Sequence, residues 1–237
     1  MGKHLQVDLA GLQRMLSEQA QRVESMVLAS YRGLQTKSLG AVQEVLDIES
    51  LVNRSEVEIE EHCLEVLALQ QPVAIDLRRV AAILKMNGDL ERIADLASNV
   101  AERTKSLLES PHLGVPEPLT HMLERALEML RDAHTAFIRL DANLARSVCA
   151  RDDEVDEINR QVIARLAEQM QQTPADVAGY LHLFSVSRII ERIADHATNI
   201  AEDVLFLVDG QIARHGATYV PAPNDSQVFP STLPTYH

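Results

Sequence analysis

The 237-residue chain contains no tryptophan, and aromatic residues make up only 3% of it. A core without large rings is built from Leu, Ile, Val, Ala and Met, which favours packed helices over a β-sandwich. The only cysteines are Cys63 and Cys149, so a disulfide framework is excluded and two reduced thiols are expected. We find no apolar signal segment and no run long enough to cross a membrane, so a cytoplasmic protein is expected.

Positive charge is also scarce. Lys and Arg total 22 against 35 Asp and Glu, which gives a formal net charge of −13. Nucleic acid is therefore not an expected partner, because binding to its phosphates needs a basic surface. Excess carboxylate suits solubility, cations or basic protein partners. The hydrophobic fraction of 46% is ordinary for a globular protein with a sizeable core.

Apolar residues recur at helical spacing almost throughout, which predicts an all-α fold. Ser38 can cap a helix, Pro72 lies just past the end of that helix, and Pro174 suits a first helical turn. Six helices are expected, over about 5–35, 38–69, 73–109, 117–141, 142–171 and 175–213.

The best linker candidate is residues 110–118, which hold three prolines and a glycine. Short connections between long helices favour antiparallel neighbours, so each half should be an up-down-up bundle. We predict two tandem three-helix bundles, over 1–112 and 113–213. Residues 214–237 are rich in Pro, Ser and Thr without periodicity, which predicts a flexible tail.

An internal repeat carries the most information. The segment LERIADLASNVAE at residues 90–102 returns as IERIADHATNIAE at residues 190–202, with nine of thirteen positions identical. Periodicity alone would preserve apolar character but not the same charged residues, so the repeat indicates an internal duplication.

On a helix, the oxygen-bearing side chains of this repeat form one stripe. With Glu91 at zero, Asp95, Asn99 and Glu102 lie about 40°, 80° and 20° around the axis. The far side faces the core and is formed by Ile93, Ala97, Val100 and Ala101. Glu91 and Asp95, four residues apart, repel one another unless a cation lies between them.

The preceding helix of each half carries a possible partner stripe at spacing i, i+4, i+7. In the first half it consists of Glu49, Asn53 and Glu56, and in the second half of Asp152, Asp156 and Asn159. If the two helices pack antiparallel, the stripes meet at a groove with enough oxygen for a multinuclear metal site. The alternative is a set of solvated carboxylates that pair with Arg92 or Arg192. His196 has Leu96 as its repeat mate, which indicates a surface or packing residue rather than a ligand.

The segments 56–80, 90–102, 151–159 and 190–202 resemble the PhoU family in order and spacing, across about residues 5–210. The resemblance implies two three-helix bundles related by a pseudo-two-fold axis, with metal clusters bound by Glu/Asp-x-x-x-Asp pairs. Ala94 and Ala194 replace the usual Gly, and Asn53 offers only an amide oxygen. The implied ligands of Fe, Zn, Mn or Mg are Glu49, Asn53, Glu91, Asp95, Asp152, Asp156, Glu191 and Asp195.

The resemblance also implies a regulator without enzymatic activity. Such a protein represses the phosphate-starvation response and couples a phosphate ABC transporter to a sensor histidine kinase; a homodimer is expected. Two alternatives stay open. One is a carboxylate-bridged metalloenzyme of di-iron type, although the single Glu-x-x-His, Glu109–His112, straddles Pro111. The other is a metal-free helical scaffold.

Overall fold

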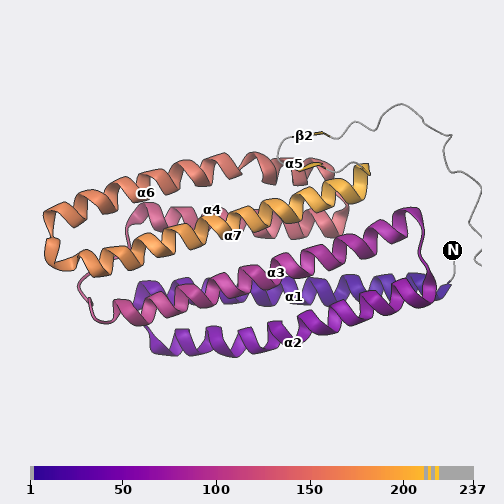
Figure 1. Ribbon diagram of the computed structural model, residues 1–237, viewed down its shortest axis with the longest axis horizontal. Helices are drawn as coiled ribbons and strands as arrows, with labels where there is room; N and C mark the ends of the chain where they lie inside the picture. Colours follow the sequence, from indigo (N-terminus) through magenta and orange to yellow (C-terminus); the bar gives the residue numbers. More distant parts are fainter. Residues whose placement is uncertain (1–2, 211–212, 215–216, 219–237) are drawn as a thin grey trace, which may run out of the picture.

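The computed structural model describes residues 3–210, 213–214 and 217–218, and it is helical over nearly all of that range (Figure 1). The all-α prediction is confirmed. The elements are α1 (Lys3–Thr36), α2 (Leu39–Gln70), α3 (Ala74–Leu107), α4 (Glu117–Arg139), α5 (Ala142–Ala150), α6 (Asp152–Gln172), the 3-10 helix η1 (Pro174–Asp176), α7 (Val177–Asp209), and the paired two-residue strands β1 (Ala213–Arg214) and β2 (Ala217–Thr218). Most of the predicted tail, 214–237, lies outside the described residues.

The helix ends follow the local signals in the sequence. The Ser38 hydroxyl accepts a hydrogen bond from the amide of Ala41 at 3.3 Å and so caps α2. Gln71 adopts a left-handed conformation that ends α2, and Pro72 follows it. Pro174 opens η1, as its fixed φ favours.

The single helix predicted over 142–171 is wrong, because the chain breaks at Arg151 into α5 and α6. The guanidinium of Arg151 donates to Asp132 on α4 at 2.6 Å and to the carbonyl of Ser147 at 3.2 Å. The bond to Asp132 holds the joint against α4. Three acidic residues then form the first turn of α6, where the helix dipole favours negative charge.

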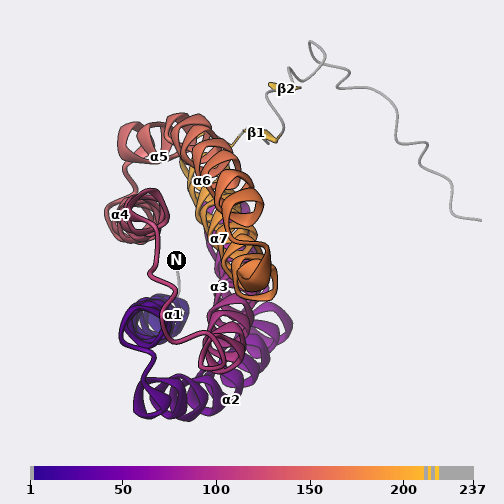
Figure 2. The same ribbon diagram turned by 90° about the vertical axis from the view of Figure 1, so that its left-hand side faces the viewer.

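The helices form two sets, α1–α3 and α4–α7, joined along α3 and α7. Seen end-on, α2, α3, α7 and α6 form one curved layer, with α1 and α4 on its concave side (Figure 2). Lys85 on α3 pairs with Asp203 on α7, and Asp89 pairs with His196. Numbers rise on one helix as they fall on the other, so α3 and α7 run antiparallel.

The core lies within each set and continues across the α3–α7 junction. Ile93 and Ile193, equivalent positions of the repeat, are both fully buried. The far side of the carboxylate stripe is buried as predicted, since Ala97, Val100 and Ala101 are each at most 3% exposed. No helix among the described residues is long and apolar enough to cross a bilayer.

A lysine fixes the connection between the two sets. The ammonium of Lys37, in the turn between α1 and α2, donates to the carbonyls of Ser110 at 3.0 Å, Pro111 at 2.5 Å and Leu113 at 2.7 Å. Burial lowers the pKa of Lys37. Leu113 packs so closely on Gly179 of α7 that an added Cβ would lie 2.2 Å from it. The linker is therefore held by both halves of the molecule.

Candidate metal centre

The second repeat brings all four of its predicted ligands into one electrostatic cluster. The pKa of Asp195 is raised to about 6, first by partial burial and then by the nearby carboxylates of Asp152, Glu191 and Asp156, in that order, while His196 opposes them. Asp195 and Glu191 lie on α7, whereas the other two carboxylates lie on α6. In this half, carboxylates from two adjoining helices therefore interact with one another through their charges, as the sequence predicted.

Two neighbours partly offset the repulsion in this cluster. Burial raises the pKa of Asp152, and the hydroxyl of Thr198 on α7, which donates to its carboxylate at 3.1 Å, lowers it. Arg188 forms an ion pair with Glu191, whose side chain is only 16% exposed. The nearby Asp156 further raises the pKa of Asp152. Negative charge remains in excess, so the cluster attracts cations.

In the first repeat, Glu91 and Asp95 face one another but are better screened. Burial raises the pKa of Glu91, followed by the charge of Asp95, whereas Arg92 lowers it. Arg92 lies 3.5 Å from Glu91 and 3.7 Å from Asp95, the pairing considered as the alternative to a metal. The charge of Glu56 on α2 also raises the pKa of Glu91. Arg92 therefore screens both carboxylates of α3 here, whereas in the second repeat Arg188 pairs with Glu191 alone.

The register of α2 and α3 places the remaining two predicted ligands. The side-chain amide of Asn87 on α3 donates to the backbone carbonyl of Glu56 at 2.9 Å. The helices run antiparallel (Figure 1), so Asn53 falls opposite Glu91, and Glu49 falls one turn further along, opposite Asp95. Neither is among the groups that shift the pKa of Glu91.

The chemistry of the donors fits a hard cation, although the side chains do not close a coordination shell. Among the described residues, no three His, Cys, Asp or Glu side chains are gathered in a group that could hold a metal ion. Two neutral donors lie on the same helices as the carboxylates, Asn87 on α3 and Asn159 on α6. Asn87 and Asn159 are 2% and 3% exposed, and their amide oxygens have no hydrogen-bond partner. A buried amide oxygen is costly unless it is paired, and it is a good ligand for a hard cation.

Sequence reasoning missed a polar cleft between α3 and α7. His196 lies 2.8 Å from Asp89 and is mostly buried, in agreement with its expected packing role. The amide of Asn199 also approaches Asp89, at 3.4 Å. No sequence signal pointed to this contact, because Asp89 has Ile189 as its repeat mate and is outside the repeated motif.

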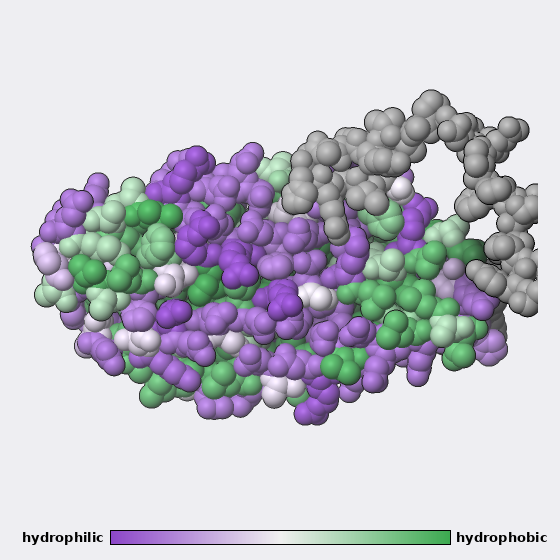
Figure 3. Space-filling view, viewed as in Figure 1, coloured by the Kyte–Doolittle hydropathy of each residue, from purple (hydrophilic) through white to green (hydrophobic). Residues whose placement is uncertain are grey.

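The cleft encloses about 630 Å³ and is bordered by Glu56, Lys85, Gly88, Glu91, Arg92, Glu202 and Asp203. Figure 3 shows hydrophilic side chains gathered over the middle of this face.

Two similar sets of long antiparallel helices, each with interacting carboxylates on neighbouring helices, define a duplicated helical-bundle protein. The PhoU domain model matches residues 16–104 and 119–204, and the chain belongs to this family. The resemblance seen in the sequence is thereby confirmed.

Curated relatives and solved structures agree with this assignment. The chain is 39% identical to the phosphate-specific transport system accessory protein PhoU homolog of Pseudomonas aeruginosa, over 81% of this chain and 80% of that protein. It is 34% identical to the homolog of Deinococcus radiodurans, over 89% and 99%. The crystal structure of PhoU from P. aeruginosa aligns with a TM-score of 0.82 at 35% identity, covering 86% of this chain and 99% of that one.

Proposed function

We propose that the protein is an accessory regulator of a phosphate-specific transport system. In this role it represses the phosphate-starvation response when phosphate is plentiful and couples a phosphate ABC transporter to a sensor histidine kinase. The observation that carries the proposal is the similarity, over four fifths of the chain, to proteins named as accessory proteins of that transport system.

The proposed role requires binding and signalling rather than catalysis. Burial raises the pKa of Cys63 to about 12 and that of Cys149 to about 11, so both thiols are protonated at neutral pH and are poor nucleophiles. Long helices offer broad faces for partner helices. We place the protein in the cytoplasm, as a homodimer, where the transporter and the kinase present their soluble parts.

The acidic clusters are the proposed metal sites. Glu191, Asp195, Asp152 and Asp156 would hold cations between α6 and α7, and Glu91, Asp95, Glu49 and Asn53 would do so between α2 and α3. A bound cation of the Fe, Zn, Mn or Mg class supplies positive charge that offsets the mutual repulsion of the carboxylates. The second site should bind more tightly, because Arg188 pairs only with Glu191 whereas Arg92 contacts both Glu91 and Asp95, and because Asn53 is neutral.

The regulatory role is tested in the host organism by deleting the gene and measuring alkaline phosphatase in high phosphate. We expect the deletion to raise phosphatase activity and the intact gene to restore repression. A deletion strain that keeps phosphatase low, while phosphate starvation still induces it, would contradict the proposal.

The metal sites are tested by elemental analysis of protein purified without chelator. Glu191→Ala plus Asp195→Ala should lower the metal content with helicity unchanged, and Glu91→Ala plus Asp95→Ala should do so to a smaller extent. The matched control is Glu157→Ala plus Glu168→Ala, which removes two exposed carboxylates of α6. Equal metal content in all of these proteins would rule out the assigned ligands.

A further inference from the structure

The two halves of the molecule meet along two lines of contact that differ in extent. In the curved layer, α3 and α7 share a more extensive contact than any other two of the described helices. On the concave side, α1 faces α4, and these two helices touch each other far less (Figure 2). We call this α1–α4 contact the concave seam. Two bodies joined firmly along one edge and weakly along another are arranged for hinge motion.

An ion pair spans the middle of the concave seam. Nε and a terminal guanidinium nitrogen of Arg131, on α4, lie 2.7 Å and 2.6 Å from the same carboxylate oxygen of Glu24, on α1. The two side chains remain 49% and 28% exposed. Because water screens an ion pair of this exposure, its contribution to closure of the seam is small.

A buried nitrogen beside this ion pair has no partner while the seam is closed. His134 lies three residues after Arg131 on α4, and its Nε2 atom is buried without a hydrogen bond. Burial lowers the pKa of His134, whereas the negative charge of Glu24 across the seam opposes that shift. Burial of an unpaired polar atom costs free energy, and opening of the seam recovers that cost by admitting water.

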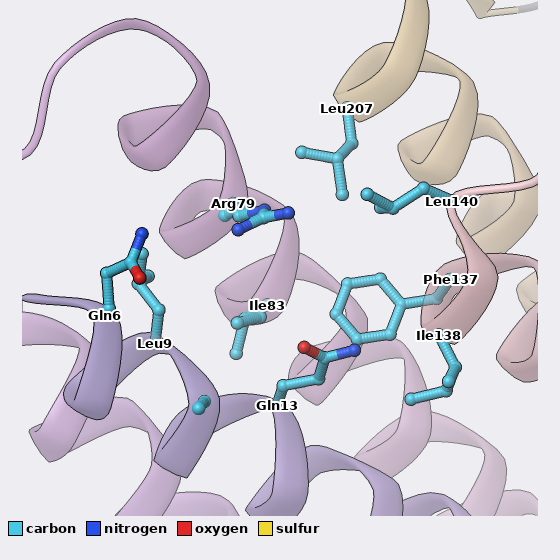
Figure 4. A pocket seen from close by; sticks show the side chains of 10 residues that line it. Gln6, Leu9, Gln13, Arg79, Ile83, Phe137, Ile138, Leu140 and Leu207 are labelled. Atoms are coloured by element: carbon cyan, nitrogen blue, oxygen red, sulfur yellow. The ribbon is translucent and has the colours of Figure 1, made fainter. Parts of the chain in front are cut away.

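A cavity interrupts the packing at one end of the concave seam. It encloses about 230 Å³ between the start of α1 and the last turn of α4, and it also borders on α3 and α7. Figure 4 shows the ring of Phe137 and the guanidinium of Arg79 pointing into this space, with Gln13 of α1 below the ring. Atoms that line a cavity lack contacts on one side and lose the attraction that those contacts provide. This end of the seam is therefore held less firmly than a close-packed pair of helices.

The opposite end of the concave seam is tied. The side chain of Tyr31, near the end of α1, forms a hydrogen bond with Thr120, near the start of α4. Lys37, just past α1, binds three carbonyls of the linker that leads into α4. The earlier Glu24 meets the later Arg131, so α1 and α4 run antiparallel. An opening of the seam is therefore smallest at the linker and largest at the cavity.

We propose that the two halves hinge about the α3–α7 junction, that the concave seam opens from its cavity end, and that the ion pair between Glu24 and Arg131 is the latch that keeps it closed. The opening exposes the facing sides of α1 and α4 and widens the concave surface of the molecule. A partner that binds only the widened surface shifts the population towards the open form. The hinge does not depend on the regulatory role proposed above, and its test needs neither phosphate nor a metal ion.

Distances between pairs of spin labels measure such a movement. Double electron–electron resonance is recorded on the whole 237-residue chain, with Cys63→Ala and Cys149→Ala to remove the native thiols. Each label pair joins two helices at exposed positions. The pairs are Val7→Cys with Arg139→Cys at the cavity end of the seam, Thr36→Cys with Glu117→Cys at the linker end, and Arg103→Cys with Leu181→Cys across α3 and α7.

Breaking the latch should shift the distances at the cavity end. We expect Glu24→Gln to raise the ratio of open to closed molecules about two- to fivefold, as the loss of a partly exposed ion pair produces. Arg131→Gln should have the same effect, because either change removes the same contact. The linker-end pair should lengthen less, and the α3–α7 pair should keep its distance. The matched control is Glu18→Gln, which removes an ion pair with Arg22 inside α1 and should shift none of them.

Two results of this experiment would overturn the proposal. A single narrow distance at the cavity end that neither latch variant changes means that the seam does not open. An equal lengthening of the α3–α7 pair means that the halves loosen as a whole and do not hinge.

A fluorescence measurement leaves the native cysteines in place. The chain has no tryptophan, so Phe137→Trp introduces a single indole beside the cavity, where the unfilled space admits the larger ring. Adding Glu24→Gln should increase the quenching of this indole by acrylamide, whereas adding Glu18→Gln should not. Equal quenching in the two double variants also contradicts the hinge.

Discussion

At the scale of single residues, the electrostatic cost of the acidic clusters is clearest at Asp195, whose pKa is raised to about 6. Asp195 is surrounded by three other carboxylates and by only one group, His196, that favours its ionised form. Its raised pKa means that the folded protein binds a proton more tightly than the unfolded chain does. Ionised Asp195 therefore destabilises the cation-free fold.

We predict that Asp195→Asn stabilises the protein at pH 7 in the presence of chelator. The pKa is raised from 3.8 to about 6, so the destabilisation by Asp195 is absent below pH 3.8 and grows as pH rises towards 6. After allowance for screening by solvent, the expected gain is about 1 kcal/mol at pH 7 and none below pH 3.8. Urea denaturation at both pH values measures it. The control is Asp47→Asn, and a loss of stability at pH 7 would contradict the prediction.

The sequence predicted the residues of these clusters better than their geometry. The stripe of Glu91 and Asp95, and its copy at Glu191 and Asp195, followed from helical spacing and duplication. The buried Asn87 did not, because an isolated asparagine carries no periodic signal and its role depends on the packing of α2 against α3.

At the scale of elements, the caps and connections set the helix ends. Ser38→Ala removes the hydroxyl that accepts the Ala41 amide and should cost about 1 kcal/mol of unfolding free energy. For a chain of this length, that corresponds to roughly 2–4 °C in Tm. Ser50→Ala, an exposed position within α2, is the control. Equal Tm values for the two variants would show that the cap contributes nothing.

The linker should respond to Lys37. Lys37→Met keeps the aliphatic stem but removes the ammonium that binds the carbonyls of Ser110, Pro111 and Leu113. We expect a loss of about 1–2 kcal/mol and faster hydrogen exchange at the Leu113 amide, which donates to Ser110 within the linker. Lys37→Arg, which retains the charge, should recover part of both. Unchanged exchange in Lys37→Met would show that the linker is held by other contacts.

The break at Arg151 illustrates why element boundaries were predicted unevenly. Pro72 and Pro174 mark helix ends by covalent geometry, which is visible in the sequence. Residues 148–153 contain neither Pro nor Gly, and their break depends on the contact between Arg151 and Asp132 on another helix. A local pattern cannot report a contact between residues that are distant in the sequence.

At the scale of the whole molecule, α3 packs against α7 and joins the two halves, so we expect the halves to unfold as one cooperative unit. Ile193→Ala should cost about 2–4 kcal/mol, because a fully buried side chain of α7 is lost from the core. We expect calorimetry to show a single transition that moves to lower temperature without splitting. Val208→Ala, at a partly exposed position of the same helix, is the control. Two separate transitions in the unsubstituted protein would show that the halves unfold independently.

The contact between Asp89 and His196 breaks the approximate two-fold symmetry that relates the two halves. The positions related to it by the repeat are Ile189 and Leu96, both apolar, so the polar contact occurs on one side of the junction only. Although the two halves arose from one ancestral unit, rotating the protein end over end no longer reproduces its surface. A partner that reads this face has a single orientation available, and a symmetric pair of partner subunits would meet unequal surfaces.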